Sequence, residues 1–146
     1  MEEALTSETY SVEVLVRVRY SEVDGLGTFY NSRALEWFEC GRTELLRSIG
    51  VPYTSMEARG VFLPLTEAHV EYAGRARYDD LLRVVTTARM VGKARVRCDV
   101  KIEHAADKSP VARGYTVHAF VGAAGKPIRP PAWFLEAMDR REGRPR

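Results

Sequence analysis

The stretch RYSEVDGLGTFYNSRALEWFECGRTEL, residues 19–45, carries the features that decide the fold. An acidic loop with two glycines within three residues stands between the end of a strand and the start of a long helix. Asn31 or Ser32 can serve as the N-cap of this helix, which we expect to run to about Ile49 because Gly50 supplies a usual helix-ending signal. The order is therefore strand, loop and one long helix.

The predicted helix is more apolar than a surface helix needs to be. At about 100° per residue, its apolar positions fill about half of the helix circumference. These positions are Ala34, Leu35, Trp37, Phe38, Gly41, Leu45, Leu46 and Ile49. Arg42 falls inside this stripe, and Glu39 lies at the i,i+3 spacing that allows an ion pair. The pattern predicts a buried helix and favours a structural ion pair over a direct catalytic role for either charged residue.

Strand patterns lie on both sides of this segment. Over residues 11–20, four valines at every second position and Tyr20 fall on one face, while Glu13, Arg17 and Arg19 point the other way, which is typical of a half-buried strand. After the helix we expect three long strands and then a fourth, at about 65–75, 80–91, 94–104 and 111–121. The strand at 94–104 alternates most regularly, so Cys98 is predicted to be a core residue and not a nucleophile.

The connections between the later strands decide the architecture. The separators at 92–93, 105–110 and 122–127 are short, so successive strands must be antiparallel neighbours. Residues 51–64 are expected to form the connection between the helix and the later strands. The economical fold is α+β, with one antiparallel sheet whose apolar face wraps around the single long helix. A short helix is predicted at about 131–139, which completes a single domain over residues 1–139, followed by a basic, solvated C-terminal tail at 140–146.

Composition excludes several classes of function. A chain of 146 residues has enough material for one domain, and a formal charge of +2 is too balanced for nucleic acid to be the main partner. No apolar run approaches the ~20 residues that cross a bilayer, and the N-terminus does not resemble a secretory signal. The two cysteines and three histidines lack metal-ligand spacing, and neither a dinucleotide motif nor a phosphate loop occurs. We therefore expect a cytoplasmic protein without a metal or an organic cofactor.

The acidic loop and the helix start suit acyl transfer. Unpaired N–H groups in the first helical turn, with the positive end of the helix dipole behind them, can polarise a thioester carbonyl and hold its oxyanion. Asp24 precedes that turn, and Gly25 and Gly27 let the backbone approach a ligand closely. An ordinary Asp is ionised at neutral pH, so Asp24 can attack the thioester or accept a proton from water.

The pattern alone does not rank the carboxylates of this segment. An Asp followed by Gly is also a common turn sequence, so EVDG by itself is more often structural than catalytic. Glu22 lies in the same loop, and Glu36 and Glu39 lie on the helix. All four acidic residues remain candidates on the basis of spacing.

A family resemblance separates these candidates. The motifs that carry it are Tyr20-Ser-Glu-Val-Asp24-Gly-Leu-Gly27, Tyr30-Asn31, Leu35-Glu-Trp-Phe-Glu39, Arg42-Thr-Glu, Tyr78-Asp79-Asp80-Leu81-Leu82 and Pro130-Pro131. Together they resemble the 4-hydroxybenzoyl-CoA thioesterase-like branch of the hotdog superfamily over roughly the whole domain. The resemblance implies a hotdog fold and hydrolysis of an acyl-CoA to a free acid and CoA.

The resemblance also implies roles for particular residues. Asp24 falls on the catalytic carboxylate of the family, and Asn31 with its neighbours falls on the backbone N–H that binds the oxyanion. Asn31 stands where many members have His, and Glu22 stands where Asp is frequent. Another hotdog branch uses a carboxylate on the central helix, so Glu36 or Glu39 is the alternative. Family members are homo-oligomers, dimers or tetramers, with active sites at the subunit interface, and a homotetramer is therefore among the expected assemblies.

The CoA part of the substrate needs cationic contacts. Lys93 and Arg95, at the turn between two predicted strands, and Arg129 near the end of the chain could meet its phosphates at a subunit boundary, although a charge at a hairpin tip is often only solvated.

Two other functions compete with hydrolysis. A hotdog lyase needs a His paired with an acid near the central helix, and none occurs before Ala68. A non-catalytic subunit that binds acyl thioesters is the second alternative.

Overall fold

The computed structural model describes residues 10–140. In chain order, the elements are β1 (Val12–Arg17), the 3-10 turn η1 (Tyr20–Glu22), α2 (Arg33–Ser48), α3 (Tyr53–Ala58), β2 (Leu65–Tyr72), β3 (Leu81–Val91), β4 (Arg95–His104), β5 (Pro110–Ala119) and α4 (Ala132–Arg140). None of the helices in this described range is both long and apolar enough to span a bilayer.

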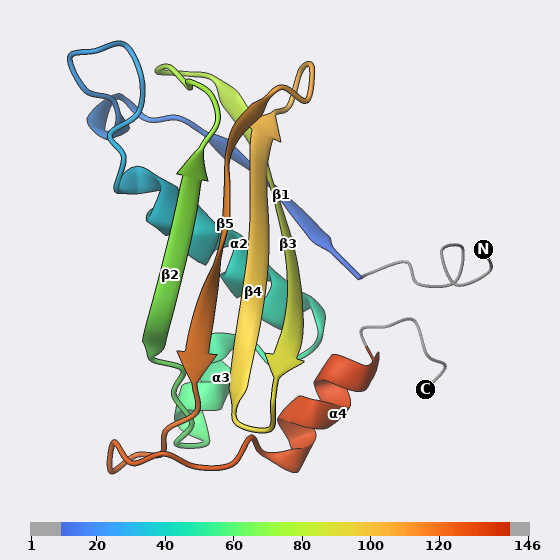
Figure 1. Cartoon of the computed structure of the whole chain (residues 1–146). Coiled ribbons are helices and arrows are strands. Elements are labelled where there is room, and N and C mark those ends of the chain that lie inside the picture. The colour runs from blue at the N-terminus through green and yellow to red at the C-terminus, as the bar shows by residue number, and fades with distance from the viewer. Residues whose placement is uncertain (1–9, 141–146) are drawn as a thin grey trace.

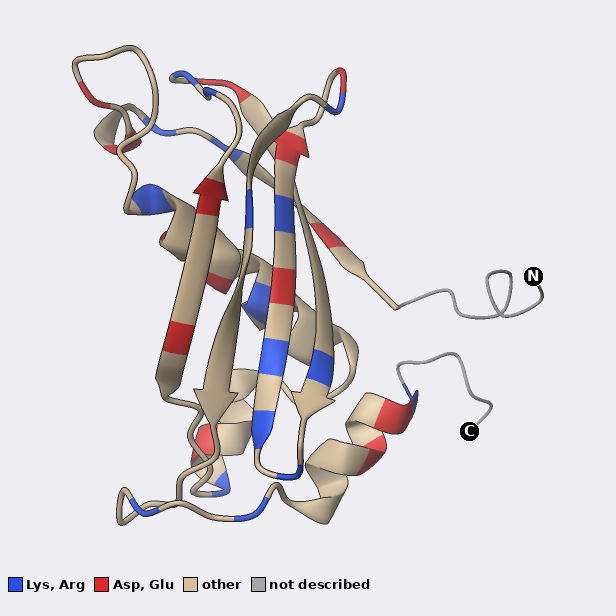
Figure 2. Ribbon diagram, viewed as in Figure 1, with Lys and Arg blue, Asp and Glu red and all other residues tan. Residues whose placement is uncertain are grey.

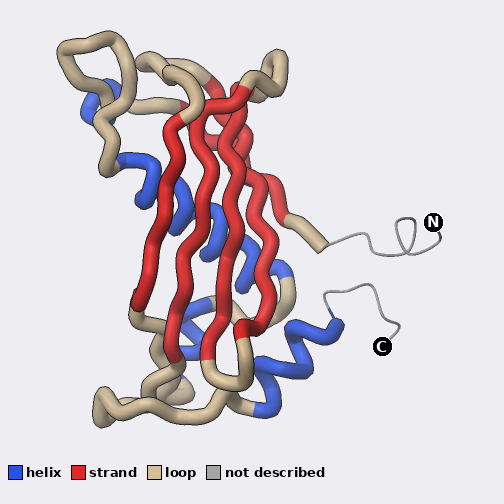
Figure 3. Tube along the Cα trace, in the orientation of Figure 1, coloured by secondary structure: helices blue, strands red, loops and turns tan. Residues whose placement is uncertain are grey.

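One antiparallel sheet of five strands forms the frame, in the order β1-β3-β4-β5-β2. The long helix α2 lies across one face of this sheet, while α3 and α4 lie near the end where β3 and β4 join (Figures 1 and 3). Alternate residues of β3 and β4 are buried, and charged residues of both signs occupy every second position along β4 (Figure 2). The predicted α+β sheet around one central helix is confirmed.

The core has two clusters along α2. The first packs Trp37 and Phe38 against the sheet residues Leu82 and Ile102. The second surrounds Leu45 and Leu46 of the helix and includes Met56, Cys98 and Phe134. Cys98 is 3% exposed, so its predicted place in the core is confirmed.

A glycine lies where α2 crosses β3. A Cβ atom placed on Gly41 would lie 2.1 Å from Thr86 Oγ1 and 3.0 Å from a methyl carbon of Val84. Real Cβ atoms do not approach other heavy atoms this closely, so the helix reaches this distance from the sheet only because residue 41 has no side chain. Gly41 therefore sets the depth at which the helix packs.

Two strands end earlier than predicted from the sequence, and the connection before β2 contains a helix. The first strand ends at Arg17, because the chain turns into η1 instead of continuing to residue 20. The connection at residues 51–64 contains the helix α3 with the buried residue Met56, which was not predicted. The strand predicted at 65–75 ends at Tyr72, where the N–H groups of Ala73 and Gly74 both turn to the carbonyl of Val111. Of the predicted tail, only the first residue is described, as the last residue of α4, and 141–146 lie outside the described range.

The edge strand β2 is exposed along most of its length. Within the described structure it pairs only with β5, so its outer edge has no strand beside it. The side chains of β2 that point to the helix side of the sheet, such as Val70 and Tyr72, are only partly covered, and Tyr72 is 52% exposed. This strand is consequently the least protected part of the sheet.

Candidate active site

The loop before α2 folds back on itself. An antiparallel bridge joins Val23 and Phe29, and the N–H of Asp24 donates to the carbonyl of Thr28 at 2.9 Å. Gly27 has a φ of +82°, a backbone conformation that favours glycine. These bonds give the loop, defined here as residues 23–29, a fixed shape that ends directly at the start of α2.

A second set of bonds ties this loop to the segment that precedes β3. The hydroxyl of Thr28 accepts a hydrogen bond from the N–H of Ala76 at 3.2 Å and lies 3.4 Å from the Ala76 carbonyl, to which it donates. Ala76 is fully buried. The loop is therefore anchored at a buried residue of the segment that leads into β3.

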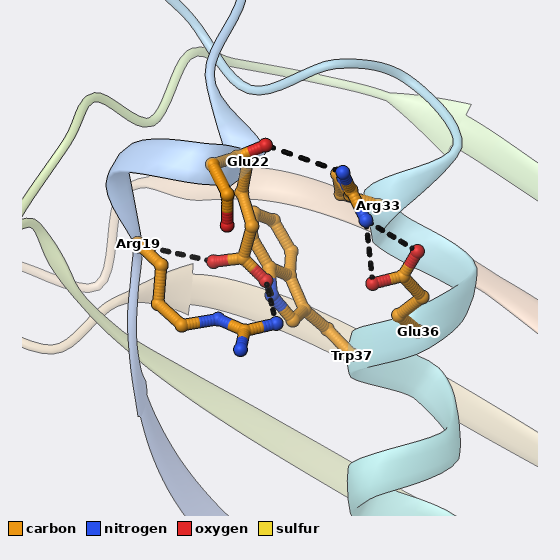
Figure 4. A network of polar contacts seen from close by, with 6 residues as sticks. Arg19, Glu22, Arg33, Glu36 and Trp37 are labelled. Atoms are coloured by element: carbon orange, nitrogen blue, oxygen red, sulfur yellow. Dashed lines mark hydrogen bonds and ion pairs between the residues drawn. The ribbon is translucent and has the colours of Figure 1, made fainter.

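Glu22 is a structural carboxylate. It is 2% exposed and accepts hydrogen bonds from the N–H of Arg19 at 2.7 Å and from Nε1 of Trp37 at 3.1 Å. The Arg19 guanidinium also pairs with it at 3.3 Å (Figure 4). A buried carboxylate with these three partners connects the loop region to α2, and its oxygens are already engaged.

Glu36 is also engaged in a local pair. The guanidinium of Arg33 bonds to the Glu36 carboxylate at 2.9 Å and reaches back to the carbonyl of Ser21 at 3.2 Å (Figure 4). Arg33 thereby fastens the first turn of α2 to η1. Of the four candidate carboxylates, Glu22 and Glu36 are thus occupied by structural contacts.

Asp24 retains a carboxylate oxygen for other chemistry. Its Oδ1 accepts the N–H of Leu26 at 2.7 Å, which forms a tight Asx-type turn, and within residues 10–140 its other oxygen has no hydrogen-bond or ion-pair partner. The side chain is neither buried nor fully exposed. Asp24 therefore combines a turn that fixes its orientation with an oxygen open to a ligand.

The start of α2 has two unused N–H groups. Ser32 occupies the N-cap without a side-chain capping bond, and the N–H groups of Asn31 and Ser32 donate to no other residue of the described chain. In the loop before α2, Val23 pairs with Phe29, and Asp24 lies opposite Thr28. Asn31 follows Thr28 by three residues, which is roughly 10 Å at the ~3.3 Å rise of a strand. The open carboxylate and the unused N–H groups therefore lie at the same end of α2.

Glu39 lies at a separate place on the helix. It is eight residues after Asn31, about 12 Å along the helix axis, and pairs with Arg42 at 3.8 Å, as predicted. Glu39 and Arg42 line a cavity of about 370 Å³ together with Thr43, Leu46, Tyr53 and Leu63. The structure therefore does not bring Glu39 together with Asp24 in one protomer.

Comparison with known proteins identifies the family. The family model of the Thioesterase-like superfamily matches residues 18–138, and this match covers most of the chain. The chain belongs to this superfamily. A crystal structure of a hypothetical protein from Aquifex aeolicus is similar to this thioesterase-like chain with a TM-score of 0.81 and 28% identity, over 87% of this chain and 98% of that one. The predicted hotdog fold is confirmed.

Two curated relatives of this thioesterase-like protein are named for activity on acyl-CoA. The acyl-CoA thioesterase YbgC of Haemophilus influenzae is 34% identical over 82 residues, which are 56% of this chain and 60% of that protein. The acyl-CoA thioester hydrolase YbgC of Escherichia coli is 34% identical over 71 residues, which are 49% of this chain and 53% of that protein. The chain spans about half the length of the first curated relatives it matches.

The cations predicted to meet CoA phosphates are far from Asp24 within one thioesterase-like protomer. Lys93 and Arg95 lie at the turn after β3, an 11-residue strand whose ends are roughly 33 Å apart, whereas the loop contacts the chain shortly before β3 begins. Arg129 lies near Lys93 and Arg95, since Arg95 pairs with Ala119 and Ile128 bonds to Phe120. All three are exposed, and they can serve the site around Asp24 only if another subunit brings them to it.

The histidines of this thioesterase-like protein do not form a metal site. No group of three or more His, Cys, Asp or Glu residues in the described range is arranged to hold a metal ion. His118 is buried, with its ring nitrogens 3.0 Å from the Leu63 carbonyl and 2.9 Å from the Thr116 hydroxyl. Burial, with the nearby positive charge of Arg42, lowers the pKa of His118 to about 4, so its ring is neutral at physiological pH. His118 is a hydrogen-bonded core residue.

Proposed function

We propose that the protein is an acyl-CoA thioesterase that hydrolyses an acyl-CoA to a free acid and CoA. The observation that carries the proposal is the open Asp24 oxygen in the loop that precedes α2, together with the two unused N–H groups at the start of that helix. The names of the YbgC relatives support acyl-CoA as the substrate class. No organic cofactor is needed for this reaction, and CoA enters only as part of the substrate.

Two mechanisms use the same geometry. Asp24 can attack the thioester carbon, so that the C–S bond breaks, CoA leaves as a thiolate, and water hydrolyses the resulting anhydride. Alternatively, Asp24 accepts a proton from water while that water attacks the carbon. In both cases negative charge develops on the carbonyl oxygen, and the N–H groups of Asn31 and Ser32 stabilise it together with the helix dipole.

Hydrolysis is favoured over the two competing functions. A lyase that removes water from a hydroxyacyl thioester needs a histidine paired with an acid beside the central helix. Residues 10–68 contain no histidine, and the buried His118 of β5 has the Leu63 carbonyl and the Thr116 hydroxyl as its ring partners, not a carboxylate. A subunit that only binds acyl thioesters has no need of an open carboxylate near the helix start.

The cytoplasm is the location that we propose, because two cysteines without disulfide spacing suit a reducing compartment.

A panel of aliphatic and aromatic acyl-CoA esters tests this proposal through release of free thiol. We expect turnover on at least one ester, and we expect a strong chelator to leave it unchanged because carboxylate chemistry needs no metal ion. Binding without thiol release would instead identify an acyl-thioester-binding subunit. Loss of activity on dialysis against the chelator, with recovery on addition of zinc, would disprove the carboxylate mechanism.

We also propose that the protein works as a homo-oligomer, a dimer or a tetramer, in which a second copy covers β2. The free edge of β2 and its uncovered helix-facing side need protection from water, and the strand ends at Tyr72, beside the start of α2. A subunit placed there can contribute residues to the site, including the distant cations.

Sedimentation at micromolar concentration tests the assembly. The wild-type protein should sediment as a dimer or a larger species. Ala68→Asp, which places a charge on the uncovered side of β2, should dissociate it. Leu15→Asp should not, because Leu15 is a 61% exposed residue of β1, at the opposite edge of the sheet from the proposed interface. A monomeric wild type, or dissociation by Leu15→Asp alone, would contradict this interface.

A further inference from the structure

Tyr72 reaches the start of α2 from the far edge of the sheet. Its hydroxyl donates a hydrogen bond to the carbonyl of Asn31 at 2.6 Å, the shortest contact that this helix start makes with another element of the described structure. The N–H of Ala34 lies 3.4 Å from the same carbonyl, so the helix itself holds it only loosely. Tyr72 is therefore the main constraint on this peptide group.

The bonded carbonyl belongs to the same peptide group as one of the two unused N–H groups. In a trans peptide the C=O of residue 31 and the N–H of residue 32 lie in one plane and point in opposite directions. Whatever fixes the Asn31 carbonyl therefore also aims the Ser32 N–H. A hydrogen bond to the carbonyl further polarises the peptide and strengthens its N–H as a donor.

The preceding peptide group is fixed in a different way. The Tyr30 carbonyl, which shares a plane with the Asn31 N–H, accepts the N–H of Arg33 at 2.9 Å. The first donor is thus aimed by the helix backbone and the second by a side chain from β2. Only the second can be weakened by changing one side-chain atom.

The tyrosine ring is itself held in place. It lies 6.0 Å from the ring of Phe29, which lies 4.9 Å from the ring of Trp37, and the Trp37 indole is bonded to the buried Glu22. Burial raises the pKa of Tyr72, so its hydroxyl stays protonated and remains a donor over the neutral pH range. The aromatic packing keeps the hydroxyl in reach of the carbonyl.

We propose that Tyr72 is a positioning residue for thioester hydrolysis, whose hydroxyl orients the Asn31–Ser32 peptide so that the Ser32 N–H faces the developing oxyanion. This inference rests on the proposed function. Tyr72 acts through the peptide group and does not need to touch the substrate. It also connects the geometry of the oxyanion donors to the strand that forms the free edge of the sheet.

The test is Tyr72→Phe, which removes the hydroxyl and keeps the ring that packs on Phe29. Removing an oxyanion donor costs roughly 100-fold or more, so losing its orientation should lower kcat by about tenfold. KM should stay within about twofold. The matched control is Tyr10→Phe, which removes a tyrosine hydroxyl bonded to Ser48 at 2.7 Å near the other end of α2 and should leave kcat unchanged.

A spectroscopic measurement separates positioning from loss of folding. With the inactive Asp24→Asn variant as background, the carbonyl stretch of a bound acyl-CoA should shift to lower frequency, and adding Tyr72→Phe should reverse part of that shift. An active wild type whose Tyr72→Phe variant keeps full kcat, or keeps the carbonyl shift, would overturn the positioning role alone. A wild type that releases no thiol from any ester would overturn the proposed function and this role together.

Discussion

Asp24→Asn should lower kcat by at least ~100-fold, because both mechanisms require the charge and basicity of the carboxylate. The substitution keeps an oxygen that can accept the Leu26 N–H, so the turn should persist. The bonds of Val23 with Phe29 and of Thr28 with Ala76 involve other groups and should also remain. We therefore expect an assembled, folded variant whose KM changes little, measured by thiol release beside thermal melts.

The control for this prediction is Glu39→Gln on the helix. Glu39 is exposed, and Arg42 is its partner, so its replacement should leave most of the activity in place. If Glu39→Gln abolishes turnover while Asp24→Asn keeps it near normal, the helix carboxylate is the catalyst. If Asp24→Asn unfolds the protein, the residue holds the turn together, and the expected outcome of a folded, inactive variant is wrong.

Gly41→Ala should destabilise the fold by about 2 kcal/mol or more, against the usual preference for alanine in helices. Replacing Gly by Ala in a helix normally stabilises it by up to ~1 kcal/mol. Here the new methyl group would overlap Thr86 Oγ1 and crowd Val84, and overpacking of this kind costs roughly 1–3 kcal/mol and occasionally more. The β-branched Thr86 side chain is stiff and fully buried, so it cannot rotate away cheaply.

Urea unfolding of a double-mutant cycle measures this contact. Thr86→Ala removes a buried hydroxyl that has no hydrogen-bond partner in the described structure, and it should recover part of the stability lost in Gly41→Ala. The matched control is Gly25→Ala, where a new Cβ meets nothing within 4 Å and the stability should barely change. An alanine variant at position 41 that is as stable as the wild type would show that the helix can shift away from β3.

Local patterns predicted most of the fold. The strand expected at 94–104 is observed at Arg95–His104, and the helix expected from Asn31 or Ser32 to about Ile49 is observed at Arg33–Ser48. The strand carries a regular alternation of apolar and polar residues, and the helix carries an apolar stripe that repeats at the helical period, so the local sequence reveals both. The helix α3 has only six residues, which is too short for a helical period to stand out from a connection.

Contacts between distant residues explain what the sequence did not reveal about the site. The Glu39–Arg42 pair was predicted because it is local. In contrast, Glu22 resembled a second candidate carboxylate until its bond to Trp37, fifteen residues later, showed that it is structural. The bond from Tyr72 to Asn31 spans 41 residues and has no motif. The catalytic roles of Asp24, Asn31 and Glu39 remain predictions.

The way the loop is anchored also determines where it tolerates variation. Leu26, at its tip, contributes a backbone N–H to the Asp24 turn, while its side chain is 80% exposed. Any residue other than proline supplies that N–H, so a combinatorial library at position 26 would alter the surface near Asp24 and leave the backbone bonds of the loop intact. Position 26 is therefore where the surface beside Asp24 can be diversified at the least cost to the fold of the loop.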